Sequence, residues 1–146
     1  METVVIDGDN LTLEMVKAVS LGSMEASLSS DSRERMQTSR KAVEDILDSG
    51  DVVYGINTGF GALSSIRIED SQLEELQSNL VRSHACGIGE IMDPEIVLMM
   101  MTIRANSLAK GVSGIRPSVV DTLLGMVNSR IAPSIPRIGS LGASGD

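Results

Sequence analysis

The chain has 146 residues, and its 20 acidic against 12 basic side chains leave a net charge of −8. This length can bury the core of one domain. The scattered Lys and Arg residues exclude a clustered cationic surface, so neither nucleic acid nor an anionic membrane is an expected partner. We expect no signal peptide or membrane span either, because the N-terminus lacks a basic region and no apolar run is long enough for a bilayer.

The remaining composition indicates a cytoplasmic protein with an aliphatic core. A single Cys, Cys86, excludes an internal disulfide and fits a reducing compartment. One Cys and one His are too few for a structural zinc site, so no metal is expected. One Tyr, one Phe and no Trp, against nine Met, predict aliphatic packing in which Met fills the gaps.

Apolar spacing predicts a mainly α-helical fold, a helical bundle with one or two very short strands. In chain order, residues 4–6 are typical of a strand, and Thr12 can cap a first helix that Gly22 ends. Asp31 with Glu34 has the spacing of a capping box and predicts the start of a second helix. The apolar positions of that helix are Met36, Val43, Ile46 and Leu47.

Three more helices follow. Ser71 with Glu74 repeats the capping-box spacing and predicts the third. The fourth covers residues 94–110, with Pro at its first position. Because this helix is apolar almost all round, we expect it to be buried on most sides. Pro117 opens the fifth helix in the same way.

Two glycine-rich segments interrupt the helical pattern and are the expected functional loops. They cover residues 52–65 and 131–146. Functional residues are frequent on loops that a rigid scaffold positions. No repeat or linker divides the chain, so we expect residues 1–146 to form a single domain portion.

The second of these loops contains Ala143, Ser144 and Gly145. In isolation such a run is typical of a flexible loop. However, the unhindered amide nitrogen of Gly145 can reach the carbonyl carbon of Ala143 and close a five-membered ring. Loss of water from Ser144 would then leave a conjugated methylene. That group is a carbon electrophile, which no standard side chain supplies.

Two other motifs support weaker interpretations. Gly59-x-Gly61 is reminiscent of a dinucleotide-binding fingerprint, but Ser64 stands at its third position and no helix opens there. Residues 142–146 are reminiscent of a nucleophile elbow, G-x-S-x-G, but Asp146 replaces the last Gly and no strand leads into the motif.

Tyr54 and His84 are the remaining candidates for chemistry. Tyr54, the only Tyr, lies in the first glycine-rich loop and becomes a candidate base if its surroundings lower its pKa. His84 lies near the end of the third predicted helix, where it can simply contact the helix dipole. A pair with Cys86 is disfavoured, because residues two apart on a helix do not face each other.

Taken together, four segments resemble the aromatic amino acid ammonia-lyase family: residues 54–61, 83–87, 106–116 and 139–146. The resemblance implies that Ala143, Ser144 and Gly145 cyclise autocatalytically into a methylidene-imidazolone (MIO) prosthetic group, whose methylene reacts with the substrate. It also implies that Tyr54 is the base that removes the β-proton. Elimination then gives ammonia and an α,β-unsaturated acid.

The pair Ser83-His84 bears on the substrate. Family members that act on histidine tend to have Ser-His here, those that act on tyrosine His-Leu, and those that act on phenylalanine Phe-Leu. The resemblance therefore implies that Ser83 and His84 bind the substrate ring, and that L-histidine is converted to urocanate in histidine catabolism. A tyrosine or phenylalanine lyase, an aminomutase of the same family, and an inactive helical fragment with an unmodified loop are the alternatives.

The family also implies a larger assembly. Its members are several times longer than this chain, form homotetramers and build each active site from more than one subunit. We therefore expect an N-terminal portion of a longer lyase, part of a larger all-α fold. We expect no lyase activity from the isolated 146-residue chain.

Overall fold

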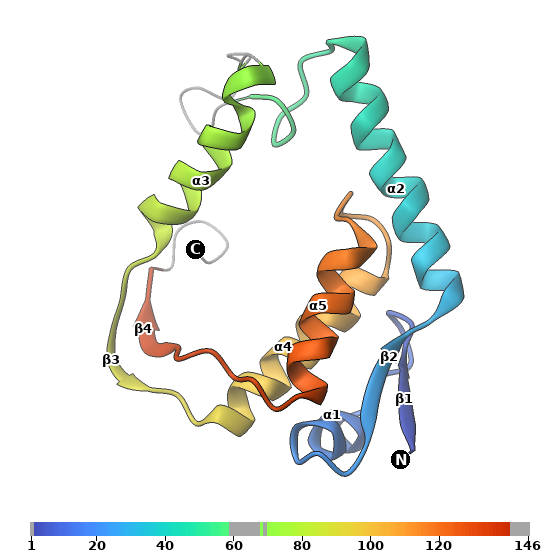
Figure 1. Ribbon diagram of the computed structural model, residues 1–146, viewed down its shortest axis with the longest axis vertical. Coiled ribbons are helices and arrows are strands. Elements are labelled where there is room, and N and C mark those ends of the chain that lie inside the picture. Colours follow the sequence, from blue (N-terminus) through green and yellow to red (C-terminus); the bar gives the residue numbers. More distant parts are fainter. Residues whose placement is uncertain (1, 59–67, 69, 141–146) are drawn as a thin grey trace. The chain divides into compact units, whose positions relative to one another are not determined.

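The computed structural model describes residues 2–58, 68 and 70–140. The elements follow one another along the chain (Figure 1) as β1 (Thr3–Ile6), α1 (Leu13–Ser20), β2 (Glu25–Leu28), α2 (Ser30–Ser49), the 3-10 helix η2 (Asp70–Gln72), α3 (Leu73–His84), β3 (Gly87–Ile91), α4 (Pro94–Ala109), α5 (Pro117–Asn128) and β4 (Pro136–Gly139). The predicted mainly α-helical fold is confirmed. The described residues contain four short strands, more than the sequence indicates.

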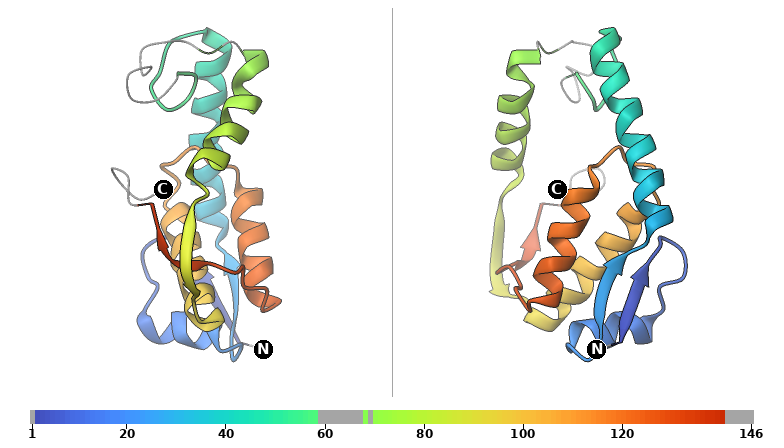
Figure 2. Two further views of the ribbon diagram at one scale, coloured as in Figure 1. Left: turned by 90° about the vertical axis from the view of Figure 1, so that its left-hand side faces the viewer. Right: turned by 45° about the vertical axis from the view of Figure 1, so that its right-hand side comes forward.

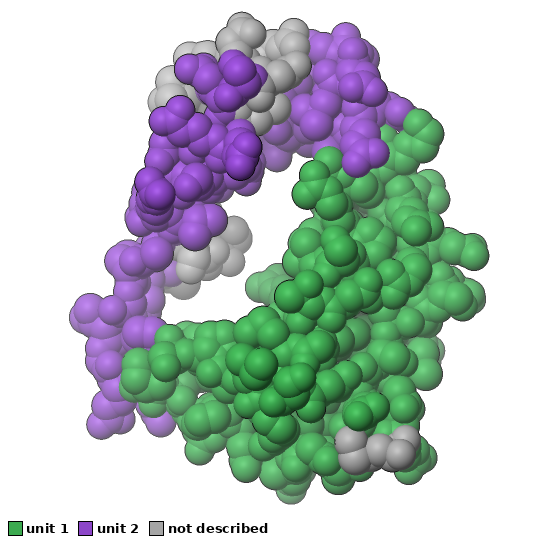
Figure 3. All heavy atoms as spheres, in the orientation of Figure 1, with its two compact units in different colours: residues 1–42, 91–135 green, residues 43–90, 136–146 purple. Residues whose placement is uncertain are grey.

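The chain divides into two compact units, coloured separately in Figure 3. Unit 1 comprises Met1–Ala42 and Ile91–Ile135, and unit 2 comprises Val43–Glu90 and Pro136–Asp146. The boundary falls within α2, so this helix contributes its first part to unit 1 and its end to unit 2.

Unit 1 contains a parallel pair of strands, β1 and β2, joined through α1. The two strands lie side by side in Figure 1 and in the right-hand view of Figure 2, with Val4 opposite Ala26 and Ile6 opposite Leu28. Side chains alternate between the faces of a strand, so Val4 and Ile6 are buried while Val5 is exposed. The side chain of Asn128 covers the free edge of β2. Its Oδ1 accepts from the Ala26 amide at 2.9 Å, and its Nδ2 donates to the Ala26 carbonyl at 2.9 Å.

The hydrophobic core of unit 1 lies between these strands and the helices. Its buried members are aliphatic or Met, as the composition predicts: Val4, Ile6, Val19, Ala26, Met36, Val97, Leu98, Met101, Ala105, Ala109, Val120, Leu124 and Val127. Half of α4 faces this core and packs on α1, α5 and β1. The prediction that α4 is buried on most sides is wrong for this chain. Its opposite face leaves Ile96, Met100 and Ile103 between 44% and 50% exposed, because no described element covers them.

Three of the five predicted helix starts are confirmed. Thr12 caps α1, accepting a hydrogen bond from the Met15 amide at 3.3 Å. Asp93 caps α4 by accepting from the Glu95 amide at 2.8 Å, directly before Pro94 at the first helical position. Pro117 opens α5.

The two predicted capping boxes are wrong. α2 begins at Ser30, and Ser29 accepts a hydrogen bond from the Ser32 amide at 3.1 Å, so Asp31 lies inside the first turn. A tertiary bond selects this start, because Ser32 Oγ donates to the Asp7 carbonyl at 3.0 Å. In unit 2, Ser71 lies inside η2, and the residue that caps α3 is Gln72, without a side-chain hydrogen bond.

Unit 2 has little apolar core of its own. Its helix α3 is followed by β3, which pairs with β4 in a two-stranded sheet. All five residues of β3 are exposed. Among the residues of unit 2 whose burial the structure describes, Asn57 and Thr58 are the buried ones, and both are polar. Across the described part of the chain, none of the helices has the length and apolarity required to cross a membrane.

Candidate active site

Tyr54 lies in a tight turn that follows α2. The Ile56 amide donates to the Val53 carbonyl at 3.1 Å, which makes Tyr54 and Gly55 the two central residues of the turn. Gly55 has a φ of +81°, whereas Tyr54 has no positive φ, and this combination is that of a type II turn. Glycine is required at the second central position because side chains disfavour the left-handed region. The turn leaves Tyr54 64% exposed, so its phenol is accessible to a ligand.

The side chain of Asn57 forms hydrogen bonds to the backbone that precedes the turn. Its side-chain Oδ1 accepts from the Val53 amide at 2.9 Å, and its Nδ2 donates to the Asp51 carbonyl at 2.7 Å. Its own carbonyl accepts from the Ile68 amide at 2.9 Å. The Tyr54 turn is therefore tied to the chain both before and after it.

Ser83 and His84 end α3 and contact each other. Ser83 Oγ lies 2.8 Å from His84 Nδ1 and also donates to the Leu80 carbonyl at 2.8 Å. His84 Nδ1 lies 2.9 Å from the same carbonyl. A carbonyl only accepts, so the tautomer that makes all three contacts hydrogen bonds carries its proton on Nδ1. In this arrangement Ser83 and the helix end fix the orientation of the imidazole.

Cys86 meets His84 through the backbone: its amide donates to the His84 carbonyl at 2.8 Å. Its side chain is exposed, and none of the hydrogen bonds described for it joins the thiol to the imidazole. A catalytic thiol–imidazole pair therefore gains no support.

The other predicted motifs lie outside the described residues. They are the tripeptide Ala143, Ser144 and Gly145, the elbow-like segment 142–146 and the glycine-rich positions 59–67. Of the predicted site residues, the structure places Tyr54, Ser83 and His84 in unit 2. It brings Ser83 and His84 into direct contact and holds Tyr54 on a separate turn.

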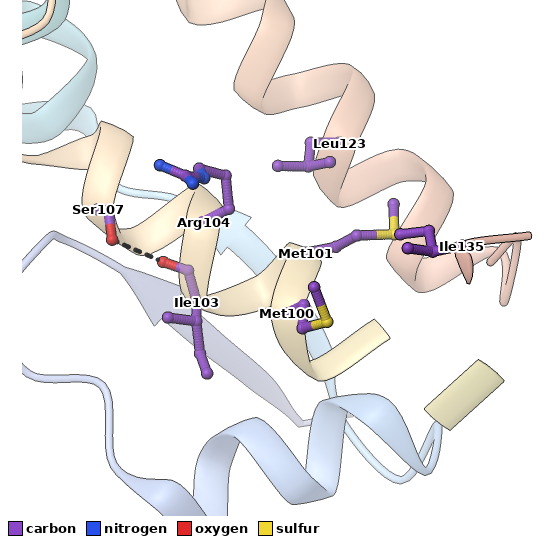
Figure 4. Close-up of a pocket in the computed structure, with 7 residues that line it drawn as sticks. All are labelled: Met100, Met101, Ile103, Arg104, Ser107, Leu123 and Ile135. Carbon is purple, nitrogen blue, oxygen red and sulfur yellow. Dashed lines mark hydrogen bonds between the residues drawn. The ribbon is translucent and has the colours of Figure 1, made fainter. Parts of the chain in front are cut away.

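A separate groove on unit 1 contains none of the predicted site residues. Figure 4 shows its lining: Met100, Met101, Ile103, Arg104, Ser107, Leu123 and Ile135. The Ser107 hydroxyl is turned back to the Ile103 carbonyl at 3.0 Å, as is usual for Ser within a helix. The groove is mainly apolar and carries no pair of groups suited to acid–base chemistry.

Acidic groups with perturbed pKa values lie in unit 1, whereas the described candidate residues belong to unit 2. Hydrogen bonds from the Asn10 side chain and from the amides of Asn10 and Asp9 lower the pKa of Asp7 to about 2. These bonds organise the loop between β1 and α1. The loop is held on α4 by the Gly8 amide, which donates to Asn106 Oδ1 at 3.0 Å. The pKa shift of Asp7 therefore reflects loop structure.

Comparison with known proteins shows the family to which the chain belongs. The model of the aromatic amino acid lyase family matches residues 11–146 of the chain. The chain belongs to this family. It is 51% identical over 143 residues to the histidine ammonia-lyase of Geobacillus sp. (strain WCH70), a match that covers 98% of the chain and 28% of that relative.

Solved structures of this family agree with the fold. The chain superposes with a TM-score of 0.86 on histidine ammonia-lyase from Trypanosoma cruzi, at 36% identity, covering 97% of this chain and 27% of that one. It superposes with a TM-score of 0.88 on tyrosine aminomutase from Streptomyces globisporus, also at 36% identity, covering 96% of this chain and 27% of that one. The chain thus spans between a quarter and a third of the length of these family members.

The sequence did not single out Asn57. Its side chain bonds to positions four and six residues earlier, a pattern that differs from the short-range turns that mark Asn in sequences. The feature that identifies Asn57 is the burial of its side-chain amide within a glycine-rich loop, and this burial is visible only in the structure.

Proposed function

We propose that the full-length polypeptide containing this chain is an ammonia-lyase that converts L-histidine into urocanate and ammonia. The observation that carries this proposal is the 51% identity, over almost the whole chain, to a protein named histidine ammonia-lyase. The position of Tyr54 on an exposed turn and the contact between Ser83 and His84 support it.

The proposed prosthetic group is MIO, formed from Ala143, Ser144 and Gly145. The chemistry of the tripeptide fits, because it provides an unhindered amide, a carbonyl and a hydroxyl that can leave as water. Once formed, the group supplies a carbon electrophile that improves the amine of the substrate as a leaving group.

Tyr54 is the proposed base for the β-proton. A β-proton is weakly acidic, so the base must be close to it and oriented toward it. Tyr54 is mostly exposed on a turn whose backbone is fixed by hydrogen bonds. This arrangement lets the phenol approach a bound amino acid without displacing other side chains from a core.

Ser83 and His84 are the proposed binding residues for the substrate ring. Ser83 Oγ and the Leu80 carbonyl lie against Nδ1 of His84, and we propose that Nε2 of the same ring contacts the substrate. In the neutral tautomer with its proton on Nδ1, Nε2 is an acceptor for the N–H of a substrate imidazole. A polar partner for the imidazole avoids burying an unpaired nitrogen, which favours histidine over phenylalanine.

The wider properties of the lyase are also part of the proposal. Residues 1–146 form an N-terminal domain portion, the full-length protein is a cytoplasmic homotetramer, and its active sites are shared between subunits. The chain spans 28% of its Geobacillus relative, so we propose that the isolated 146-residue chain is inactive.

Intact mass and product absorbance test the proposal on the full-length polypeptide. Formation of MIO removes two waters, so the mass should lie about 36 Da below that of the unmodified chain. Ser144→Ala should restore the unmodified mass for its sequence and abolish turnover. Urocanate should form from histidine faster than coumarate forms from tyrosine. An unmodified mass in active protein would refute the MIO assignment, and faster turnover of tyrosine would identify a different family activity.

A further inference from the structure

We propose that Asn57 is a positioning residue for Tyr54: its buried amide fixes the turn that presents the phenol to the substrate. This inference rests on the proposed role of Tyr54 as the base. Asn57 itself is fully buried, whereas Tyr54 is mostly exposed, so Asn57 acts through the backbone rather than by touching the substrate.

The bonds of Asn57 enclose the turn. The side chain joins the Asp51 carbonyl and the Val53 amide, which precede Tyr54. The backbone carbonyl of Asn57 accepts from Ile68, on the far side of the glycine-rich loop. Asn57 thus holds the chain where it enters the turn, where it leaves it and where it returns.

The second central position of the turn, Gly55, is open. A β-carbon added at Gly55 would meet no heavy atom within 4 Å, so the second central position faces open space. Tyr54, the first central position, is 64% exposed. The backbone bonds to Asn57 therefore constrain the turn that carries the phenol.

Asn is chemically suited to this position because one short side chain must both donate and accept. Asp at neutral pH only accepts, so Asn57→Asp would keep the size but lose the donor to the Asp51 carbonyl. Ala would remove the partner of the Asp51 carbonyl and of the Val53 amide, both of which lie in part-buried hydrogen bonds. Both changes should loosen the turn without altering the Tyr54 side chain itself.

Tyr54 is its own reporter in the 146-residue chain, which has one Tyr and no Trp. Asn57→Ala and Asn57→Asp should lower the fluorescence anisotropy of Tyr54 toward the value of a short peptide. The matched control is Asn128→Ala, because Asn128 also joins a backbone amide and carbonyl, but on β2 in unit 1. It should leave the anisotropy unchanged. An unchanged anisotropy in both Asn57 variants, with wild-type circular dichroism, would overturn the proposal.

Kinetics of the full-length polypeptide test the consequence for catalysis. A displacement of about 1 Å can cost about 100-fold in rate, so Asn57→Ala should lower kcat by about that factor with little change in KM. In a Tyr54→Phe background the same change should cost much less, because the base it positions is gone. Equal losses in both backgrounds would overturn the proposal. If Tyr54→Phe alone leaves kcat unchanged, the proposed base is wrong, and the anisotropy still decides whether Asn57 fixes the turn.

Discussion

The two units of this chain are stabilised in different ways. In unit 1, a continuous cluster of aliphatic and Met side chains is buried between the strands and the helices α1, α4 and α5. In unit 2, the buried residues that the structure describes are Asn57 and Thr58, and the side chain of Asn57 bonds to the backbone. The three described candidate site residues, Tyr54, Ser83 and His84, all lie in unit 2.

This difference separates the buried apolar core from the candidate site residues. Apolar burial is the main source of stability, so unit 1 contains the part of the chain that supports its own fold. Unit 2 presents polar and ionisable side chains on a turn and at a helix end, where a ligand can reach them. A region with so few buried apolar contacts is expected to open locally at low free energy.

The largest stability effect is expected for Leu98→Ala in unit 1. Leu98 in α4 is buried in the core, so the change should lower the free energy of unfolding by about 2–5 kcal/mol. Leu76→Ala in α3 of unit 2 removes a half-buried side chain and should cost less than about 2 kcal/mol. Urea unfolding followed by circular dichroism measures both. Equal costs would show that unit 2 has an apolar core comparable to that of unit 1.

A smaller effect is expected for Gly111→Ala, just after α4. Gly111 has a φ of +75°, and a β-carbon there would lie 2.6 Å from the β-carbon of Arg35. The strained backbone and the contact with α2 should lower the free energy of unfolding by about 1–3 kcal/mol. Gly125→Ala in α5 is the control, because a β-carbon there meets nothing within 4 Å. That change should be neutral or stabilising by up to about 1 kcal/mol, since Ala favours helices. If Gly125→Ala lowers the free energy of unfolding as much as Gly111→Ala, the positive φ and the contact with Arg35 are not the cause of the effect at Gly111.

The smallest effect is expected for the ion pair between α2 and α5. Arg33 donates two hydrogen bonds to Asp121, at 2.7 and 2.9 Å. These bonds hold the pKa of Asp121 below its ordinary value of 3.8. Because the pair is exposed, Asp121→Asn should lower the free energy of unfolding by less than about 1 kcal/mol at neutral pH.

The pH dependence of that pair has a definite sign. The carboxyl has a lower pKa in the folded chain than in the unfolded chain, so its contribution is complete above the unfolded value. The contribution is lost as the pH falls through the folded pKa. The stability difference between wild type and Asp121→Asn, measured by urea unfolding, should therefore shrink in acid and also in high salt. A difference that grows in acid would contradict the assignment of the pair as the cause.

The part of the fold that the sequence predicts well is encoded by local signals. Thr12, Asp93 with Pro94, and Pro117 mark helix starts through their own side chains, and the structure confirms these starts. The family resemblance is likewise carried by contiguous motifs, and the family match confirms it.

The rest depends on partners distant in the sequence. β2 is a strand because it pairs with β1 and with the side chain of Asn128, neither of which is local. α2 starts at Ser30 because the Ser32 hydroxyl bonds to Asp7, which favours Ser29 over the equally plausible Asp31 cap. For the candidate site, Tyr54, Ser83 and His84 could be named from their motifs. The contribution of Asn57 could not be predicted, because its hydrogen bonds to Asp51, Val53 and Ile68 follow no local sequence pattern.

The central claim is that unit 2 supplies the base of an ammonia-lyase through Tyr54. Its most direct test is the kcat of the full-length Tyr54→Phe variant with histidine, together with its intact mass. We predict a loss of about 100- to 10,000-fold in kcat, the range for removing a general base. The mass deficit of about 36 Da should persist, because the tripeptide is untouched. A wild-type kcat would contradict the claim, and loss of the mass deficit would instead assign Tyr54 to the formation of the prosthetic group.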